Sequence, residues 1–297
     1  MPELVFRCPR CRTGTVATTD SECDSCGRRL PLSGGLPDFV ADPQRVDERR
    51  FYDEEYAGES RPSSGTELAD LAEHWAPDGN ILRRLVYENL GGLRGKRVLL
   101  LGNGSSDREL HFLSEQPSAM VLSDLSIEAV RALSTRYDLG AAQERLTFAA
   151  IDAYDLPFPD DSIDLVYGDA FVHHLSPLDP FFAEVARVLA PGGRAVFVDD
   201  AYSPLWQRSK ETWLKPVMDY THRRNPISPE DMRFTMAGGF KEEDLAPRIR
   251  AVGGQPFFIR QSLIYYFWTR AADRLFPARL LFLGEARWVV RPMIALD

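Results

Sequence analysis

The sequence has little of three things: positive charge, long apolar runs, and cysteine beyond its first 26 residues. Its 297 residues include 35 lysines and arginines against 44 acidic residues, which gives a formal net charge of −9. An acidic balance disfavours a broad surface for phosphate backbones. Nucleic acid is therefore not the expected partner.

No uninterrupted apolar run reaches the length of about 18 residues that a membrane span needs. The N-terminus also lacks a charged segment followed by an apolar one, the pattern of a secretion signal. The sequence shows neither internal repeats nor low-complexity segments. These absences predict a cytoplasmic protein with no membrane span.

The hydrophobic content of 44% is enough for a large core, and the length suits one large domain with a small appendage. Composition shifts divide the chain into residues 1–40, which hold all four cysteines, a linker and helical cap at 41–94, and a main domain at 95–297. Residues 201–243 interrupt the pattern of the main domain, and we interpret them as a lid over the substrate.

The four cysteines form two Cys-x-x-Cys pairs, Cys8 with Cys11 and Cys23 with Cys26, separated by an eleven-residue spacer. Two such knuckles can place four thiolates around one zinc ion, and four cysteines leave no open position for chemistry. The sequence therefore predicts a structural zinc ribbon. A reduced or redox-active set of cysteines is the alternative.

The charged stretch 42–59 carries Phe51, Tyr52 and Tyr56 at helical spacing. A helix here could cover a binding cleft, although aromatic stripes of this kind are more often packing surface. Two further helices are predicted at 67–75 and 80–90, the second ended by two glycines.

From residue 96 the pattern alternates between short apolar strands and amphipathic helices. Strands are expected at 97–101, 119–123, 146–151, 163–167 and 194–199, and helices at 106–116, 126–137 and 177–190. A further helix at 241–252 leads to a sixth strand at 256–260. Alternation of this kind predicts an α/β fold with a doubly wound, Rossmann-like, mostly parallel sheet.

Polar residues follow three of these strands where parallel strands place their ligands. The first strand runs into Gly102-Asn103-Gly104, a turn whose glycines let the backbone approach a ligand. The second ends at Asp124, and Asp152 follows the third. A carboxylate after the second strand can accept both ribose hydroxyls. A Gly-x-Gly turn alone is often only a turn, but the two acids beside it indicate a nucleoside pocket.

Two longer motifs carry a resemblance to a known family: Asp152-Ala-Tyr-Asp-Leu-Pro-Phe-Pro-Asp-Asp-Ser-Ile-Asp-Leu-Val166 and Arg187-Val-Leu-Ala-Pro-Gly-Gly-Arg194. Residues 95–200 resemble the small-molecule, UbiE-like subgroup of class I S-adenosylmethionine-dependent methyltransferases. The resemblance implies a seven-stranded sheet, with its last strand at 287–291. It also implies S-adenosylmethionine or S-adenosylhomocysteine as ligand. The resemblance assigns eight residues to that cofactor: Gly102, Asn103 and Gly104 at the methionine end, Asp124 and Leu125 at the ribose, Asp152 and Ala153 at the adenine, and Asp169 on the floor of the pocket.

The chain departs from the family at two positions. Leu100 stands where the family usually has an acid, and Ser106 stands where it usually has a glycine. The first change removes a usual support for the ammonium and carboxylate end of the cofactor. The second is a milder steric change.

Three histidines are candidates for a general base: His173 and His174 after the fourth strand, and His222 in the insertion. In the resembling family such a histidine pair also occurs at the start of a helix or beneath the cofactor as a support. His222 is equally well explained as solvent-exposed charge. Asp199 and Asp200 close the fifth strand, where capping the next turn is the simplest role.

The resulting hypothesis is an enzyme that methylates an oxygen, nitrogen or carbon of a small molecule, in a biosynthetic setting. The apolar stretch 263–283 would be core, an apolar or aromatic substrate wall, a membrane-surface contact or a homodimer face. Two alternatives stay open. One is a ribosomal-RNA guanine methyltransferase, because one such family joins a cysteine ribbon to this fold. The other is a protein of this fold that binds the cofactor without transferring methyl.

Overall fold

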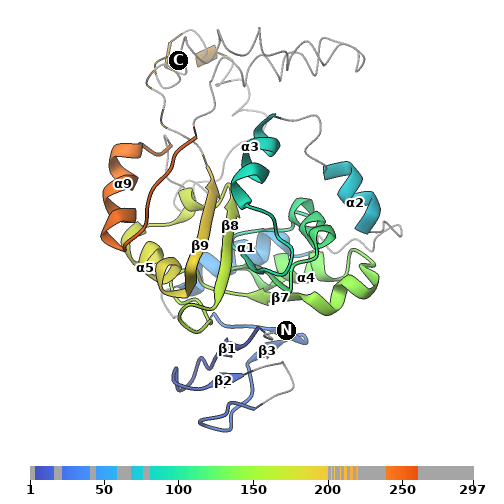
Figure 1. Ribbon diagram of the computed structural model, residues 1–297. Helices are drawn as coiled ribbons and strands as arrows, with labels where there is room; N and C mark the ends of the chain where they lie inside the picture. Colours follow the sequence, from blue (N-terminus) through green and yellow to red (C-terminus); the bar gives the residue numbers. More distant parts are fainter. Residues whose placement is uncertain are drawn as a thin grey trace.

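The computed structural model describes residues 4–16, 22–40, 45–58, 68–75, 81–199 and 239–259, together with single positions between 202 and 219. Its centre is a parallel sheet flanked by helices, with the cysteine-bearing N-terminal segment beneath it (Figure 1). No helix of the described part is long and apolar enough to cross a membrane.

The sheet has five described strands in the order β7-β6-β5-β8-β9, all parallel. Their bounds are β5 Arg97–Leu100, β6 Ala119–Asp124, β7 Leu146–Ala150, β8 Ile163–Asp169 and β9 Leu189–Val198. β5 lies in the middle, and its Val98, Leu99 and Leu100 are at most 1% exposed. This arrangement confirms the predicted doubly wound fold, in which central parallel strands are apolar throughout.

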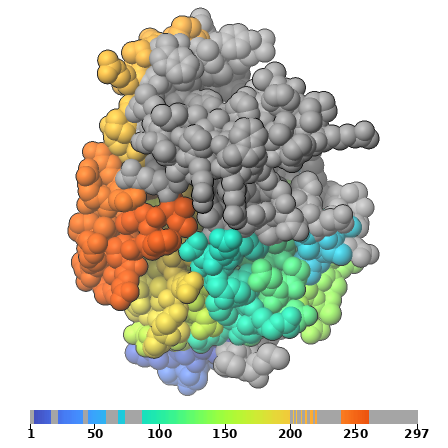
Figure 2. Space-filling view, turned by 45° about the horizontal axis from the view of Figure 1, so that its top comes forward, coloured from blue at the N-terminus to red at the C-terminus, as the bar shows by residue number. Residues whose placement is uncertain are grey.

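Alternate residues of each strand face opposite sides of the sheet, so each side has its own apolar cluster. One cluster includes Val98 and Leu100 and is covered by four helices: α2 Leu68–Trp75, α3 Ile81–Leu90, the 3₁₀ helix η3 Arg108–Glu115, and α4 Ile127–Ser134. The other includes Leu99 and Leu101 and is covered by α5 Leu178–Val188 and α9 Glu242–Ala251. α9 forms one flank of the molecule (orange in Figure 2).

The second cluster is completed by the N-terminal module. Its four short strands, β1 Phe6–Arg7, β2 Thr15–Val16, β3 Leu32–Ser33 and β4 Leu36–Pro37, form two hairpins. The connection from β7 to β8, residues 151–162, contains no helix. The module packs there: the Phe6 ring lies 5.1 Å from Phe39 and 5.5 Å from Phe158, and Phe39 N donates to Ala150 O at 2.9 Å. The module is thus part of the core that covers the sheet.

Helix α1, Val46–Tyr56, links this module to the sheet. Arg49 makes a bidentate ion pair with Asp38, at 2.8 and 3.0 Å, at the end of the module. On the other side Asp53 accepts a 2.6 Å hydrogen bond from the Ser126 hydroxyl, which itself caps α4. These two contacts fix α1 across the carboxyl edge of β6.

Several predicted boundaries need correction. The helix expected at 106–116 is a 3₁₀ helix that begins at Arg108, because Ser106 belongs to the preceding turn, which its N–H closes by donating to Asn103 O at 3.1 Å. The sixth strand expected at 256–260 is absent from the described residues 256–259. The expected strand at 287–291 and the apolar stretch 263–283 lie outside the described residues.

The two ends of the predicted lid insertion meet. Tyr202 N donates to Phe240 O at 2.7 Å, and the Lys241 ammonium lies 4.8 Å from the centre of the Tyr202 ring. Phe240, just before α9, therefore lies beside Tyr202, just after β9. Most of the insertion, including His222, lies outside the described residues.

Candidate functional site

A cavity of about 340 Å³ opens at the carboxyl edge of the sheet, the edge where ligands bind in folds of this kind. Its wall is formed by residues of β5, β6, β8, α1 and η3 and by the loops that follow the strands. All eight residues that the sequence analysis assigned to a cofactor line it: Gly102, Asn103, Gly104, Asp124, Leu125, Asp152, Ala153 and Asp169.

The turn after β5 needs its glycines for two reasons. Gly102 and Gly104 have φ values of +61° and +55°, a region that other residues avoid. A Cβ atom at Gly102 would lie 2.0 Å from the Phe171 ring, and one at Gly104 would lie 2.7 Å from Oη of Tyr56. Asn103 holds the turn by donating from Nδ2 to Ser106 O at 2.6 Å.

Asp124 ties this turn to the start of α4. Its Oδ2 accepts from Gly104 N at 2.7 Å, and its Oδ1 accepts from Ser126 N at 2.9 Å. Burial raises the pKa of this carboxyl, while the backbone donors oppose the rise. Each carboxylate oxygen has a second lone pair that can accept from a ligand hydroxyl.

Asp152 is 5% exposed and lies where the chain leaves β7. It accepts from Tyr154 N at 3.0 Å and forms an ion pair with Arg45 Nε at 3.4 Å. The Arg45 guanidinium also lies 4.3 Å from the centre of the Tyr154 ring. Arg45 is therefore a cavity residue that the sequence analysis missed.

Helix α1 and its N-cap present one stripe to the cavity: Arg45, Glu48, Tyr52 and Tyr56, at spacings of three, four and four. The sequence analysis favoured ordinary packing for the tyrosines, and the structure places them in the cavity wall instead. Glu48 pairs with Arg45, and burial raises the pKa of its carboxyl. The sequence signal that could have identified this stripe was the helical spacing of its charged and aromatic residues, which places them on one face of the helix.

Two more missed residues lie at the start of η3. Arg108 pairs with Asp169, the last residue of β8. Glu109 is only 3% exposed and borders the same cavity, and burial raises the pKa of its carboxyl to about 7. Nothing in the sequence pattern marks Glu109 except its position five residues after Gly104.

His173 and His174 lie beside each other, with ring centres 4.1 Å apart. His173 Nδ1 donates to Asp199 Oδ1 at 2.9 Å, and His173 N donates to Asp199 Oδ2 at 3.1 Å. Asp199 therefore orients His173, and the turn that it was expected to cap lies outside the described residues. His174 lines the cavity, and its Nδ1 is 3.0 Å from the Tyr52 hydroxyl.

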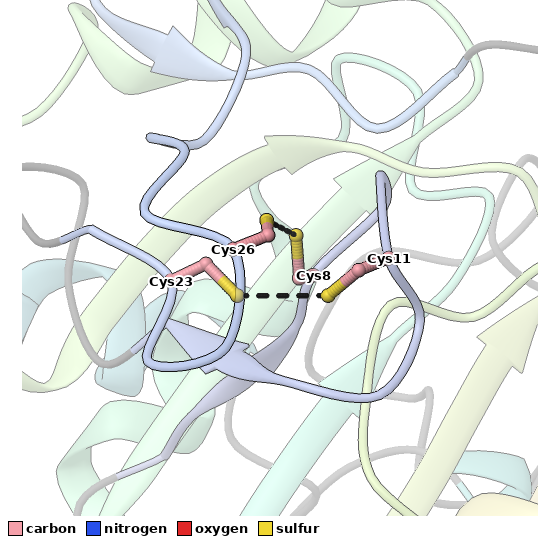
Figure 3. A group of neighbouring side chains, drawn as sticks. All are labelled: Cys8, Cys11, Cys23 and Cys26. Atoms are coloured by element: carbon pink, nitrogen blue, oxygen red, sulfur yellow. Dashed lines mark hydrogen bonds between the residues drawn. The ribbon is translucent and has the colours of Figure 1, made fainter.

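The four cysteine sulfurs converge in the N-terminal module (Figure 3). The Cys8–Cys26 and Cys11–Cys23 sulfur distances are both 3.7 Å, and all four atoms lie within 4.8 Å of one another. A tetrahedral zinc site with Zn–S bonds of about 2.3 Å needs sulfurs about 3.8 Å apart. Backbone N–H groups of Gly14 and Ser25 point at Cys11 and Cys23 sulfurs at 3.4 Å. The geometry and the donor set fit one zinc ion.

Residues 99–197 match the family model described as a methyltransferase domain, which is one third of the chain. Similar curated proteins include the fatty-acid O-methyltransferase of Mycolicibacterium smegmatis, 33% identical over 39% of this chain and 43% of that protein. The malonyl-[acyl-carrier protein] O-methyltransferase of Geobacter sulfurreducens is 34% identical over 52% of this chain and 59% of that protein. The UbiE C-methyltransferase of Paracoccus denitrificans is 30% identical over 37% and 45%. The chain thus spans about half the length of these relatives.

Among solved structures, phosphoethanolamine N-methyltransferase 2 of Haemonchus contortus shares the fold, with a TM-score of 0.50. It is 17% identical and is matched over 83% of this chain and 54% of its own. The fold is therefore a Rossmann-like methyltransferase fold.

The buried Glu109 predicts a stability difference that depends on pH. Because its pKa is raised to about 7, against 4.5 ordinarily, its protonated form stabilises the fold fully below about pH 4.5, and this contribution is lost as the pH rises through 7. The charges that face it are Arg108 and Asp169. We expect Glu109→Gln to exceed the wild type in free energy of unfolding by less than about 1 kcal/mol at pH 5 and by about 2–3 kcal/mol at pH 8.

Urea unfolding of both proteins from pH 5 to 8 measures this difference. Glu144→Gln, at an exposed position, is the control and should follow the wild type at every pH. A constant difference between Glu109→Gln and the wild type would contradict the assigned pKa.

Proposed function

We propose that the cavity binds S-adenosylmethionine and that the chain transfers its methyl group to a small molecule. The observation that carries this proposal is the convergence of eight motif residues from four strand ends on one cavity, within the segment that matches a methyltransferase domain. In this assignment the glycine turn takes the methionine end, Asp124 the ribose hydroxyls, and Asp152 and Ala153 the adenine.

The charge of the cavity wall supports this cofactor. Five carboxylates and two guanidinium groups line the described wall: Glu48, Glu109, Asp124, Asp152 and Asp169 against Arg45 and Arg108. S-adenosylmethionine carries a sulfonium, an ammonium and a carboxylate, so it is a net cation. An acidic wall attracts such a ligand and repels the pyrophosphate of a dinucleotide. This argues against a nicotinamide dehydrogenase on the same fold.

The cofactor, when bound, supplies an activated methyl group. The residues of this chain then have three tasks: to align the acceptor, to keep water away, and to remove a proton where the acceptor carries one. The carboxylate of Asp199 holds His173 in the tautomer with its proton on Nδ1, so Nε2 is its basic atom. His174 lies against His173, and both His174 and its neighbour Tyr52 line the cavity, so the histidine pair reaches the cavity wall. We assign the base role to this histidine pair.

The acceptor is proposed to be an oxygen or carbon of an apolar small molecule in a biosynthetic pathway. Relatives are named as a fatty-acid O-methyltransferase, a malonyl-[acyl-carrier protein] O-methyltransferase and a ubiquinone/menaquinone C-methyltransferase, so their names place the methyl on oxygen or carbon. The tyrosines of α1 provide a matching aromatic wall. The insertion that leaves the sheet after β9 and returns at Phe240 is the proposed lid.

The four cysteines are proposed to hold one structural zinc ion. Four thiolates fill its coordination sphere, so the ion would stabilise the module and take no part in methyl transfer. Because the module covers the sheet beside β7, its stability is part of the stability of the whole domain.

Gly104→Ala tests the cofactor assignment. The new Cβ would meet Tyr56 at the cavity wall, so we expect the dissociation constant for S-adenosylmethionine to rise at least tenfold by calorimetry. Gly140→Ala is the matched control, because Gly140 also has positive φ, at +52°, but its Cβ would meet no atom within 4 Å. Both variants carry a similar backbone cost of about 1–2 kcal/mol. Equal affinities for the two variants would remove the turn from the binding site.

His173→Asn and Asp199→Asn test the base. A metabolite extract is incubated with the protein and S-adenosylmethionine, and mass spectrometry identifies the compound that gains one methyl. With that acceptor we expect both variants to lower kcat by about 10²–10⁴ while cofactor affinity is unchanged. His174→Asn is the companion variant, and a loss confined to it would move the base to His174. Cofactor binding with no methylated product would instead indicate a binding protein without transferase activity.

Cys26→Ser tests the zinc site with little damage to packing, because Cys26 is exposed. We expect one zinc per wild-type chain by metal analysis, less than one in the variant, and a lower midpoint for a single unfolding transition. Ser25→Ala, next to it and also exposed, should keep the metal. Wild-type protein that holds no zinc after purification in zinc-supplemented medium would reject the site.

A further inference from the structure

The cavity lacks the acid that the resembling methyltransferases usually place two residues before the first glycine. Leu100 occupies this position, is 1% exposed and packs in the apolar cluster with Phe112 and Tyr167. An aliphatic side chain cannot accept a hydrogen bond from an ammonium group. The amino-acid end of the proposed cofactor would then need another acceptor on the same wall.

We propose that Arg108 and Glu109 form that subsite, Glu109 for the ammonium group and Arg108 for the carboxylate of the cofactor's amino-acid end. Both line the cavity that Leu100 also borders. They follow the Gly102–Gly104 turn at the start of η3, so the backbone that meets the methionine end also delivers both charges. This subsite rests on the proposed function, because it concerns how the same cofactor is held.

Glu109 differs from the other carboxylates of the described wall in what it contacts. Asp124 accepts backbone N–H groups, Asp152 and Glu48 pair with Arg45, and Asp169 pairs with Arg108. Glu109 accepts from a neutral hydroxyl, that of Ser106, at 3.2 Å. The cation that faces it, Arg108, is paired with Asp169, so Glu109 is only partly neutralised before an ammonium arrives.

A buried carboxylate that is only partly neutralised is costly, and an incoming positive charge relieves that cost. Burial has already raised the pKa of Glu109, which shows how strongly this site disfavours an isolated negative charge. Ser106 contributes as well: the position where the family usually has glycine here supplies the hydroxyl that orients Glu109. The two departures from the family pattern, Leu100 and Ser106, are thus parts of one rearrangement.

Arg108 suits the other half of the ligand. Its side chain is 41% exposed, and one of its nitrogens pairs with Asp169. A guanidinium has five N–H donors in a planar fork, so it can bind a carboxylate while keeping this pair. Opposite charges on adjacent residues thus match a zwitterionic amino acid.

The test compares two ligands on Glu109→Gln, which keeps the size of the side chain and removes its charge. S-adenosylmethionine carries the amino-acid end, whereas 5′-methylthioadenosine is the same nucleoside without it. By calorimetry we expect the variant to bind S-adenosylmethionine at least about tenfold more weakly, as for loss of a hydrogen bond between charged groups. Its affinity for 5′-methylthioadenosine should equal that of the wild type, which also shows that the variant is folded.

The outcomes separate the two levels of the proposal. A wild type that binds neither ligand overturns the proposed function. A Glu109→Gln variant that binds S-adenosylmethionine as the wild type does, or a folded one that weakens for both ligands equally, overturns the subsite alone. If this variant does not fold, Arg108→Gln at the more exposed neighbour takes its place. That variant should lose affinity for S-adenosylmethionine and keep it for 5′-methylthioadenosine, and an equal change for both would overturn the subsite.

Discussion

A parallel sheet that is apolar on both faces must be covered on both, and this constraint explains most of the molecule. Helices α2, α3 and α4 with η3 cover one face, and α5 and α9 cover part of the other. The helix-free connection from β7 to β8 leaves the remainder open, and Phe6 and Phe39 of the N-terminal module close it. The cysteine module is therefore a structural substitute for a crossover helix.

The same constraint positions the cavity. With both faces covered, the carboxyl edge of the strands is where loops, strand ends and α1 can surround a ligand. α1 reaches this edge because Arg49 and Asp53 hold it between the module and α4. Arg45, at the start of α1, and Glu109, in η3, both line this cavity and carry opposite charges. In the proposed binding mode Arg45 lies at the adenine end of the ligand and Glu109 at the amino-acid end.

The predictable part of the structure was what local sequence determines. Apolar runs gave the five strands, and the ligand geometry of paired cysteines gave the sulfur cluster. Arg45, Glu109 and the Asp199–His173 pair were not predictable, because each depends on contacts between distant segments. The strand expected at 256–260 was wrong over its described residues: Phe257 is 76% exposed, so an aromatic and β-branched run alone did not make a strand.

The docking of the N-terminal module has a consequence for synthesis of the chain. Arg7 and its partner Asp155 are 148 residues apart, whereas the paired sulfurs of Cys8 and Cys26 are 18 residues apart. At about 5–20 residues per second, the module leaves the ribosome roughly 7–30 s before its docking surface exists. During that interval Phe6 and Phe39 lack the core that later buries them. The proposed zinc site needs only these nearby cysteines, so it could form at once and would keep this first segment ordered until the sheet has been synthesised.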